Sequence, residues 1–324
     1  MIDFVGLGIL SVLVLLFGYL TIRAWGSRRG WLKWVGLVLG GLATILFAAL
    51  FIGAILGTTR LNADFNARNP APQLTVAANQ EQLEWGAKYA QFCAGCHSPD
   101  NTLPLVGNDF GGEIPIPIGT LYAPNLTPAG DLKDWTDGEI LRAIREGVHK
   151  NGRPLLVMPA GEFHALSDED AMSLIAYLRS QPAAGADTPE NQLNAIGALL
   201  ANMPGILQNQ PHISQPVPKP AVEPNAEYGK YLAEILVCSS CHGEKLTGGI
   251  SFDGSAAPNL TLVVPQWSEE QFFTAFRTGT LPGGKTLDPN KMPSKEFSAF
   301  ATDTDLKALY QYLHGLTPTQ AASQ

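Results

Sequence analysis

Charged residues and cysteines are both scarce in this chain of 324 residues. Asp, Glu, Lys and Arg make up 15% of it, whereas about a quarter is usual in soluble proteins. Two runs, 4–22 and 34–59, contain none of these residues, and each is long enough to cross a hydrocarbon core of about 30 Å as a helix. The start also lacks the positive segment of a cleaved signal peptide. We therefore predict a membrane anchor of two transmembrane helices within residues 1–60.

Acidic residues are absent between these two runs, where the chain has Arg23, Arg28, Arg29 and Lys33. The positive-inside rule places such a short loop in the cytoplasm. The rest of the chain is then expected on the periplasmic side of the inner membrane. Beyond residue 60 there are 28 acidic and 16 basic residues, because residues 1–60 hold one of the 29 acids and five of the 21 bases. This acidic excess argues against a nucleic acid partner.

The four cysteines all belong to two Cys-x-x-Cys-His motifs, which leaves none for a disulfide. Such motifs attach c-type haem, because two thiols one helical turn apart can form thioethers with one porphyrin while the adjacent histidine binds its iron. A zinc site usually has its cysteine pairs closer in sequence, and a dithiol redox motif needs a βαβ context; both remain alternatives. We predict two haem c groups. The motifs consist of Cys93, Cys96 and His97 and of Cys238, Cys241 and His242.

Each motif is followed by one methionine in a matching context, which is a candidate sixth ligand of the iron. Met158 and Met292 lie 61 and 50 residues after the motif histidines, and each precedes a proline. Methionine ligation raises the reduction potential of a haem, although methionine is more often core filling. His164 is the competing ligand, but its counterpart in the second copy is Ser298. Met172 falls inside a predicted helix and has Lys307 as its counterpart, so a surface or packing role is expected.

The motifs lie in two copies of one plan, over residues 80–182 and 225–318. Both copies contain Ala-Pro-Asn-Leu-Thr, a Trp followed by a capping box, an Arg-x-Gly helix end and Met-Pro-x-x-Glu-Phe-x-Ala. Both close with a capped helix of helical apolar period. No strand-like alternation of useful length is present. The expected fold is all-α, with two tandem helical domains after the anchor.

Three segments lie outside the anchor and the two copies. Residues 61–79 are polar, contain two prolines and have the composition of a tether. Residues 183–224 form a Pro-rich linker, and its apolar stretch 193–207 predicts a short helix that packs on the domains or lies on the membrane surface. Residues 319–324 form a short tail.

Backbone carbonyls are expected to support the motif histidines. Pro124 and Pro258 lead the Asn-Leu-Thr segments, and a carbonyl at such a turn can accept the ring N–H of a ligand histidine and fix its tautomer. The alternative is that these prolines mark turns only. The histidines at 149, 212 and 314 lie outside matched positions and are expected on the surface.

Both copies resemble class I cytochrome c domains. Together they resemble the membrane-anchored di-haem cytochrome c subunits of alcohol and aldehyde dehydrogenases. The strongest stretch, 119–182, combines the Ala-Pro-Asn-Leu-Thr, Asp-Trp-Thr, Arg-Glu-Gly and Met-Pro motifs. The resemblance implies that the first and last helices of each copy cross at Gly86 and Tyr177 and at Gly229 and Tyr312. The chain departs from the family pattern in its two N-terminal spans and in having two rather than three haem motifs.

These observations predict an electron carrier rather than an enzyme. Two covalently bound haems would relay electrons between a donor dehydrogenase or quinol-oxidising complex and a terminal acceptor in a respiratory chain. The expected partners are the lipid bilayer and redox proteins, with the chain as a subunit of a larger complex. A di-haem subunit of a haem-copper oxidase or photosynthetic complex is an alternative. A di-haem peroxidase or a haem-based sensor needs an open iron, which the two Met-Pro motifs disfavour.

Overall fold

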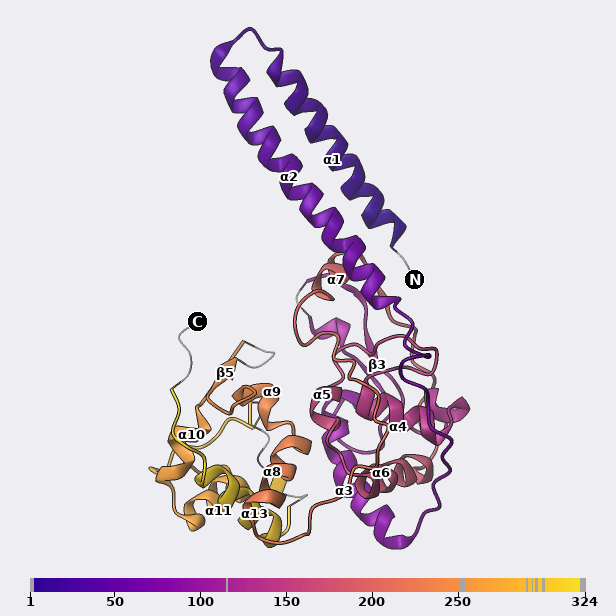
Figure 1. Ribbon diagram of the computed structural model, residues 1–324, viewed down its shortest axis with the longest axis vertical. Helices are drawn as coiled ribbons and strands as arrows, with labels where there is room; N and C mark the ends of the chain where they lie inside the picture. The colour runs from indigo at the N-terminus through magenta and orange to yellow at the C-terminus, as the bar shows by residue number, and fades with distance from the viewer. Residues whose placement is uncertain are drawn as a thin grey trace.

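The structure, a computed structural model, describes residues 3–114, 116–250, 254–289, 291, 292, 294, 297, 298 and 301–320. Over these residues the protein is mostly helical, with two long N-terminal helices that project from a body of shorter helices and loops (Figure 1). Pro293, Glu296 and Ala299 of the second Met-Pro motif lie outside the described residues, as does 321–324 of the expected tail.

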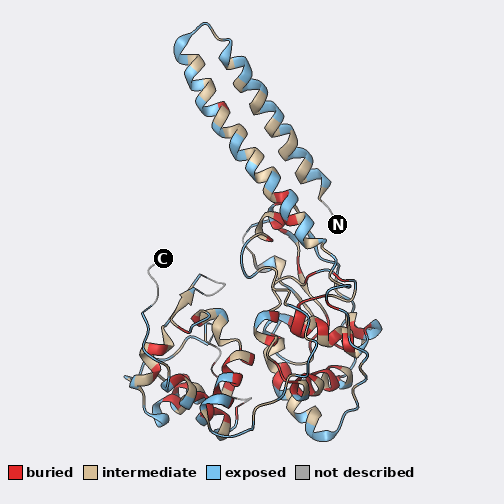
Figure 2. Cartoon of the chain, viewed as in Figure 1, coloured by how far each residue is buried: buried red, intermediate tan, exposed pale blue. Residues whose placement is uncertain are grey.

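The two long helices are α1 (Phe4–Trp25) and α2 (Gly30–Leu61), which run antiparallel to one another (Figure 1). Both are long and apolar enough to cross a membrane. Asp3 caps α1, because its side chain accepts a hydrogen bond of 3.0 Å from the backbone N–H of Gly6. Most of their side chains are exposed or half-buried (Figure 2). A paired apolar surface of this extent fits a membrane anchor.

The first half of the body, residues 80–182, is built on four α-helices. Local signals in the sequence set their ends. Thr136 and Glu139 form the predicted capping box at the start of α4, and Gly147 ends this helix at a φ of +65°, a left-handed conformation that glycine adopts without strain. The helices are α3 (Gln80–His97), α4 (Asp137–Glu146), α5 (Ala160–Phe163) and α6 (Asp168–Ser180), with short 3-10 turns at Gly111–Glu113 and Asp131–Asp134.

The second half, residues 225–318, repeats much of this plan. Ser268 and Gln271 form the predicted capping box, and Gly279 ends the same helix at a φ of +73°. The halves differ before the haem motif, because Val237 has a φ of +51° and separates two helices where α3 is continuous. The described helices are α8 (Ala226–Ile235), α9 (Cys238–His242), α10 (Leu260–Val263), α11 (Glu269–Thr278) and α13 (Asp303–His314), with a 3-10 turn at Val264–Gln266.

The first and last helices of each half cross at a glycine, as the resemblance to class I cytochrome c domains implies. A Cβ atom on Gly86 would lie 2.1 Å from a backbone carbonyl oxygen of α6 and 2.8 Å from the Cβ of Tyr177. A Cβ on Gly229 would lie 1.9 Å from a carbonyl oxygen of α13 and 2.8 Å from the Cβ of Tyr312. Atoms in folded proteins do not pack this closely, so any larger residue would push the helices apart.

The described strands are all two residues long and antiparallel. They pair as β1 (Asn108–Asp109) with β3 (Tyr122–Ala123), β2 (Gly119–Thr120) with β4 (Gln192–Leu193), and β5 (Gly249–Ile250) with β6 (Ala256–Ala257). The fold is therefore mostly helical rather than strictly all-α. Strands this short are too brief for an apolar alternation to predict them.

The segment between α2 and α3, expected to be a tether, lies against α4. Arg142 donates hydrogen bonds of 3.0 Å to the side-chain oxygen of Asn66 and to the carbonyl oxygen of Asn69. Glu146 accepts from the Nδ2 of Asn69 at 2.6 Å and, on its other oxygen, from the backbone N–H of Ile213 at 2.9 Å. One helix of the first half therefore holds both the tether and the linker.

The linker also contains the short helix that its apolar stretch predicts, α7 (Ala195–Leu200), which lies at the foot of α1 and α2 (Figure 1). Just before it, β4 pairs with β2 of the first half. After residue 210 the linker is extended and leads to α8.

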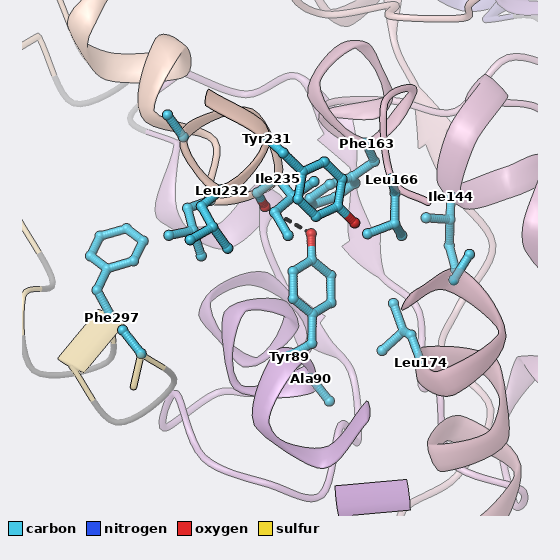
Figure 3. Close-up of a cluster of buried hydrophobic side chains, with 14 of the residues drawn as sticks. Tyr89, Ala90, Ile144, Phe163, Leu166, Leu174, Tyr231, Leu232, Ile235 and Phe297 are labelled. Atoms are coloured by element: carbon cyan, nitrogen blue, oxygen red, sulfur yellow. Dashed lines mark hydrogen bonds between the residues drawn. The ribbon is translucent and has the colours of Figure 1, made fainter. Parts of the chain in front are cut away.

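The two halves share a buried interface. Tyr89 of α3 donates a hydrogen bond of 2.7 Å to the carbonyl oxygen of Ile235 in α8 (Figure 3). In the opposite direction, the hydroxyl of Tyr231 in α8 donates a hydrogen bond of 2.5 Å to the Oδ2 of Asp170 in α6. Apolar side chains from both halves surround these hydroxyls in one continuous core. Buried hydrogen bonds of this kind are costly to break, so the halves form one body.

Candidate haem sites

The first Cys-x-x-Cys-His motif occupies the last turn of α3. Cys96 and His97 follow Cys93 by three and four residues, a spacing that places side chains on one face of a helix. His97 is buried, and its Nδ1 lies 2.8 Å from the carbonyl oxygen of Pro124. The carbonyl support predicted from the sequence is therefore present. When Nδ1 donates this hydrogen bond, Nε2 carries no proton and can bind a metal.

The second motif forms α9 and has the same support. Its histidine, His242, is buried, and its Nδ1 lies 2.8 Å from the carbonyl oxygen of Pro258. The two sites thus agree in the atom that orients the imidazole and in the distance to it. They differ in the approach of the chain, because Val237 turns it sharply just before Cys238. The backbone conformation of Val237 is uncommon for a β-branched residue.

Burial controls the protonation of the motif residues in the polypeptide. Burial raises the pKa of the Cys93 thiol to about 12, and the charge of Cys96 adds to this rise. Burial likewise raises the pKa of Cys238 to about 12. For His97 and His242, burial lowers the pKa, although the bonds to the proline carbonyls oppose this shift. Both imidazoles are therefore neutral at pH 7, which is the form that binds metals.

Met158 and Met292 both lie on connections that pack against the apolar core. Each is half-buried and contacts the same continuous core as the partly buried Cys93 and Cys238. Val157 precedes the first methionine with a φ of +61°, an uncommon conformation for a β-branched residue. The structure thus places both methionines, Cys93 and Cys238 against one shared apolar core.

The remaining histidines have varied surroundings. His164, the competing ligand, has its Nδ1 3.0 Å from the carbonyl oxygen of Arg145. His314 is exposed, as expected. His149 corrects the expectation of a surface residue, because it is half-buried with its ring edge-on to Trp135, at a centroid distance of 4.7 Å. Burial lowers its pKa. Its partner was not evident from the sequence because contacts between rings fourteen residues apart depend on the fold.

The comparison with known families agrees with this geometry. The chain matches a family model described as "Cytochrome C oxidase, cbb3-type, subunit III" over residues 81–178 and 224–313. These two stretches make up more than half of the chain, and each contains one motif and its supporting proline. The chain belongs to this cytochrome family. Membership implies covalently bound haem c.

Several curated relatives of this cytochrome are named as subunits of dehydrogenases. Its sequence is 27% identical, over 278 residues, to the "Alcohol dehydrogenase (quinone), cytochrome c subunit" of Gluconacetobacter polyoxogenes, covering 75% of this chain and 58% of the relative. It is 32% identical, over 266 residues, to the "Gluconate 2-dehydrogenase cytochrome c subunit" of Pantoea cypripedii, covering 71% and 58%.

A third relative is the "Fructose dehydrogenase cytochrome subunit" of Gluconobacter japonicus, which is 25% identical over 293 residues, covering 82% of this chain and 59% of the relative. This cytochrome therefore spans less than two thirds of the length of these relatives. Their names describe cytochrome subunits, and as a member of the matched cytochrome family the chain is an electron-transfer protein rather than itself an enzyme.

The residues present fit haem c. Each motif offers two thiols one turn apart, a buried neutral imidazole with its Nδ1 already bonded, and an adjoining apolar core. A porphyrin is largely apolar and requires such surroundings. None of the four cysteines forms a disulfide. Within the described part of the chain, no group of three or more His, Cys, Asp and Glu side chains is arranged to hold a metal ion.

The structure adds one contact of the second motif that sequence reasoning missed. Glu162, four residues after Met158, accepts hydrogen bonds from Ser240 at 2.7 Å and Ser239 at 3.2 Å. These serines are the two variable residues of the second Cys-x-x-Cys-His motif. A residue of the first Met-Pro motif thus touches the second haem motif. Only the recurrence of this glutamate in both Met-Pro motifs pointed to it, without indicating its partner.

Proposed function

We propose that this cytochrome binds two haems c in two tandem class I domains, residues 80–182 and 225–318. Each haem is attached through two cysteines, with one histidine and one methionine as ligands of its iron. The first site consists of Cys93, Cys96, His97 and Met158, and the second of Cys238, Cys241, His242 and Met292.

The repeated histidine support carries this proposal. In both halves the motif histidine is buried, and its Nδ1 meets a proline carbonyl at 2.8 Å. A single Cys-x-x-Cys-His sequence can arise by chance. Two such motifs, each with a proline carbonyl bonded to its histidine and each within a stretch that matches the family, indicate the same function at both sites. Both methionines adjoin the same core as these motifs, which supports their role as the second ligand.

The role of the two sites is one-electron relay. When bound, each haem supplies an iron that exchanges a single electron. The chain's own residues would keep each site closed: the carbonyl of Pro124 or Pro258 orients the histidine, the methionine would supply the second ligand, and the apolar core would exclude water. The interface between the halves joins α3, which ends in the first motif, to α8, which ends just before the second, because Tyr89, one turn before Cys93, bonds Ile235, three residues before Cys238.

The location follows from α1 and α2. We propose that both helices cross the inner membrane, with the basic loop between them in the cytoplasm and the haem domains in the periplasm. The four basic residues in that loop and in the adjoining helix ends, and the absence of acids there, support this orientation. The segment 61–79 then leads from the membrane to the first domain, 183–224 links the domains, and 319–324 forms a tail.

The proposed donor is a dehydrogenase or a quinol-oxidising complex, from which electrons pass to a terminal acceptor. The names of the dehydrogenase cytochrome subunits support this assignment. The second candidate is the di-haem subunit of a haem-copper oxidase, which the description of the matched family favours. In both cases the cytochrome works as a subunit of a larger complex.

Spectra of the purified, full-length protein test this proposal. Pyridine haemochrome analysis should give two haems per chain. The oxidised protein should show a methionine-to-iron charge-transfer band in the near infrared for both haems, and carbon monoxide should leave the spectrum of the reduced form unchanged. One haem per chain would refute the two-site assignment. A carbon monoxide shift would refute the closed sites and favour a peroxidase or sensor.

A further inference from the structure

The linker helix α7 is fastened to both N-terminal helices. The backbone N–H of Ala195, the first residue of α7, donates a hydrogen bond of 2.9 Å to the Oδ2 of Asp3, the residue that caps α1. Just after α7, the Nδ2 of Asn202 donates one of 2.9 Å to the carbonyl oxygen of Gly53 in α2. A segment nearly 200 residues from the start of the chain therefore contacts both helices of the anchor.

The packing between α7 and α2 is close. A Cβ atom on Gly57 would lie 1.7 Å from the carbonyl oxygen of Ala198, and one on Gly53 would lie 2.7 Å from a methyl carbon of Leu199. At Gly57 the two backbones therefore touch without a side chain between them, and at Gly53 the side chain of Leu199 packs directly on the backbone of α2. Such contact fixes the position of α7 along the axis of α2.

Both helices of the anchor place α7 at the same depth. Gly53 lies twenty residues beyond Lys33 in α2, which is about 30 Å at a rise of about 1.5 Å per residue. Asp3 lies twenty residues before Arg23 in α1, which gives the same distance. A hydrocarbon core is about 30 Å thick. With the basic loop at the cytoplasmic edge, α7 therefore lies at the outer edge of the bilayer.

The surface of α7 and its neighbours is apolar at this depth. Ile196 is 42% exposed, Met203 is 53% exposed, and Ile116 is 44% exposed. Ile116 belongs to this surface because Asn194, the cap of α7, donates a hydrogen bond of 2.7 Å to the carbonyl oxygen of Pro117. The surrounding stretch 191–218 contains no Asp, Glu, Lys or Arg, although this part of the chain is acidic as a whole.

We propose that Ile116, Ile196 and Met203 form a lipid-contact surface that rests in the headgroup layer of the outer leaflet. Apolar side chains at this level gain free energy by entering the interface, and an uncharged segment pays little for leaving water. The surface is continuous with the lipid-facing sides of α1 and α2. It fixes the height of the first domain above the bilayer. This inference rests on the proposed two-pass anchor.

Single-cysteine labelling tests the proposal in the haem-loaded, full-length protein. The native cysteines are thioether-bound in the proposed sites, so a nitroxide reacts only with a new thiol. The variants are Ile196→Cys and Met203→Cys, and the matched control is Val222→Cys, which is 54% exposed and precedes α8, at the far end of the body from α1 and α2 (Figure 1). All three replace an exposed apolar side chain, so the fold should tolerate them.

The labelled proteins are placed in vesicles of phosphatidylethanolamine and phosphatidylglycerol, and collision rates with oxygen and with a neutral nickel chelate are measured by electron paramagnetic resonance. Oxygen concentrates in lipid and the chelate in water. The ratio of oxygen to chelate collisions should be severalfold higher at 196 and 203 than at 222. Equal ratios at the three positions would overturn the lipid-contact surface.

If the haem or anchor proposals are wrong, the experiment gives results that differ from those that contradict the lipid-contact surface. Labelling of the wild-type protein would show that native thiols are not bound to haem, and the depth would then be read from the difference between variant and wild-type signals. Loss of the protein from the vesicle fraction on flotation would contradict the anchor, and with it the lipid-contact surface.

Discussion

The motif histidines depend on backbone atoms rather than on other side chains. Each Nδ1 lies at hydrogen-bond distance from a proline carbonyl oxygen. Proline has no backbone N–H, so its segment needs no hydrogen-bond acceptor at this position. Such a carbonyl holds the imidazole in one tautomer and raises its basicity. Burial also prepares the imidazole for metal binding, because it lowers the pKa of the ring and so keeps the ring neutral.

Replacement of Met158 by histidine should lower the reduction potential of one haem only. Methionine ligation favours the ferrous state more than histidine ligation does, and axial ligands span about 0.8 V overall, so we expect a fall on the order of a few hundred millivolts. Spectroelectrochemical titration would measure it, together with loss of one near-infrared methionine band. The control is Met172→Leu on α6, which should change neither. An unchanged potential in Met158→His would contradict the assignment of this ligand.

For single residues, the sequence was informative where a short pattern of neighbouring residues defines the chemistry. The two motifs, the Met-Pro context and the proline carbonyls could all be predicted from short patterns, and the carbonyl contacts are confirmed. The cysteine, histidine and methionine assignments remain predictions. The contact of Glu162 with Ser239 and Ser240 could not be predicted, since it joins residues nearly 80 positions apart.

Helix ends were also predictable, because caps act within one turn. The capping boxes of α4 and α11 and their terminal glycines are confirmed, as is the short helix of the linker. The separation of α8 from α9 was not predicted. Nothing local in Leu236 and Val237 signals a turn, so the packing of the second half imposes the left-handed conformation of Val237. The two-residue strands were also not predicted, because their pairing depends on segments that the fold brings together.

Alanine at Gly86 should destabilise the first half. Its Cβ would lie 2.1 Å from a carbonyl oxygen of α6, so α3 and α6 must separate, at a cost of about 1–3 kcal/mol. Chemical denaturation followed by circular dichroism would give the free energy of unfolding. The matched control is Gly95→Ala in the same helix, where a Cβ meets nothing within 4 Å. If both variants unfolded like wild type, the crossing would not be tight.

The association of the two halves is the main feature of the whole molecule that the sequence did not reveal. Tyr89 and Tyr231 look like core residues of their own helices, and no periodicity shows that each reaches the other half. The same is true of the segment after α2, whose polar composition suggested a tether. Its contacts with Arg142 and Glu146 depend on residues that are far apart in the chain.

Phenylalanine at Tyr89 should weaken the link between the halves. The change removes only the hydroxyl and leaves the carbonyl oxygen of Ile235 buried without this donor, which costs about 1–3 kcal/mol. We expect a lower midpoint in urea and, as the halves uncouple, a broader transition by circular dichroism. Tyr177→Phe serves as the control, because the Cβ of Tyr177 lies at the crossing with Gly86, within the first half. Identical curves for Tyr89→Phe and wild type would contradict a stabilising role of the interface.

The fastening of the segment after α2 to α4 has a consequence for how this cytochrome would meet the partners proposed above. If this segment were flexible, the proposed haem domains would move through a volume of solution beside the membrane and find a partner in three dimensions. A body fixed rigidly to its membrane anchor moves only as the anchor diffuses. The search for a partner is then two-dimensional, and the orientation of the body relative to the membrane is set before the two proteins collide. We therefore expect encounters to be governed by lateral diffusion and by the packing of α1 and α2 against a membrane-embedded partner.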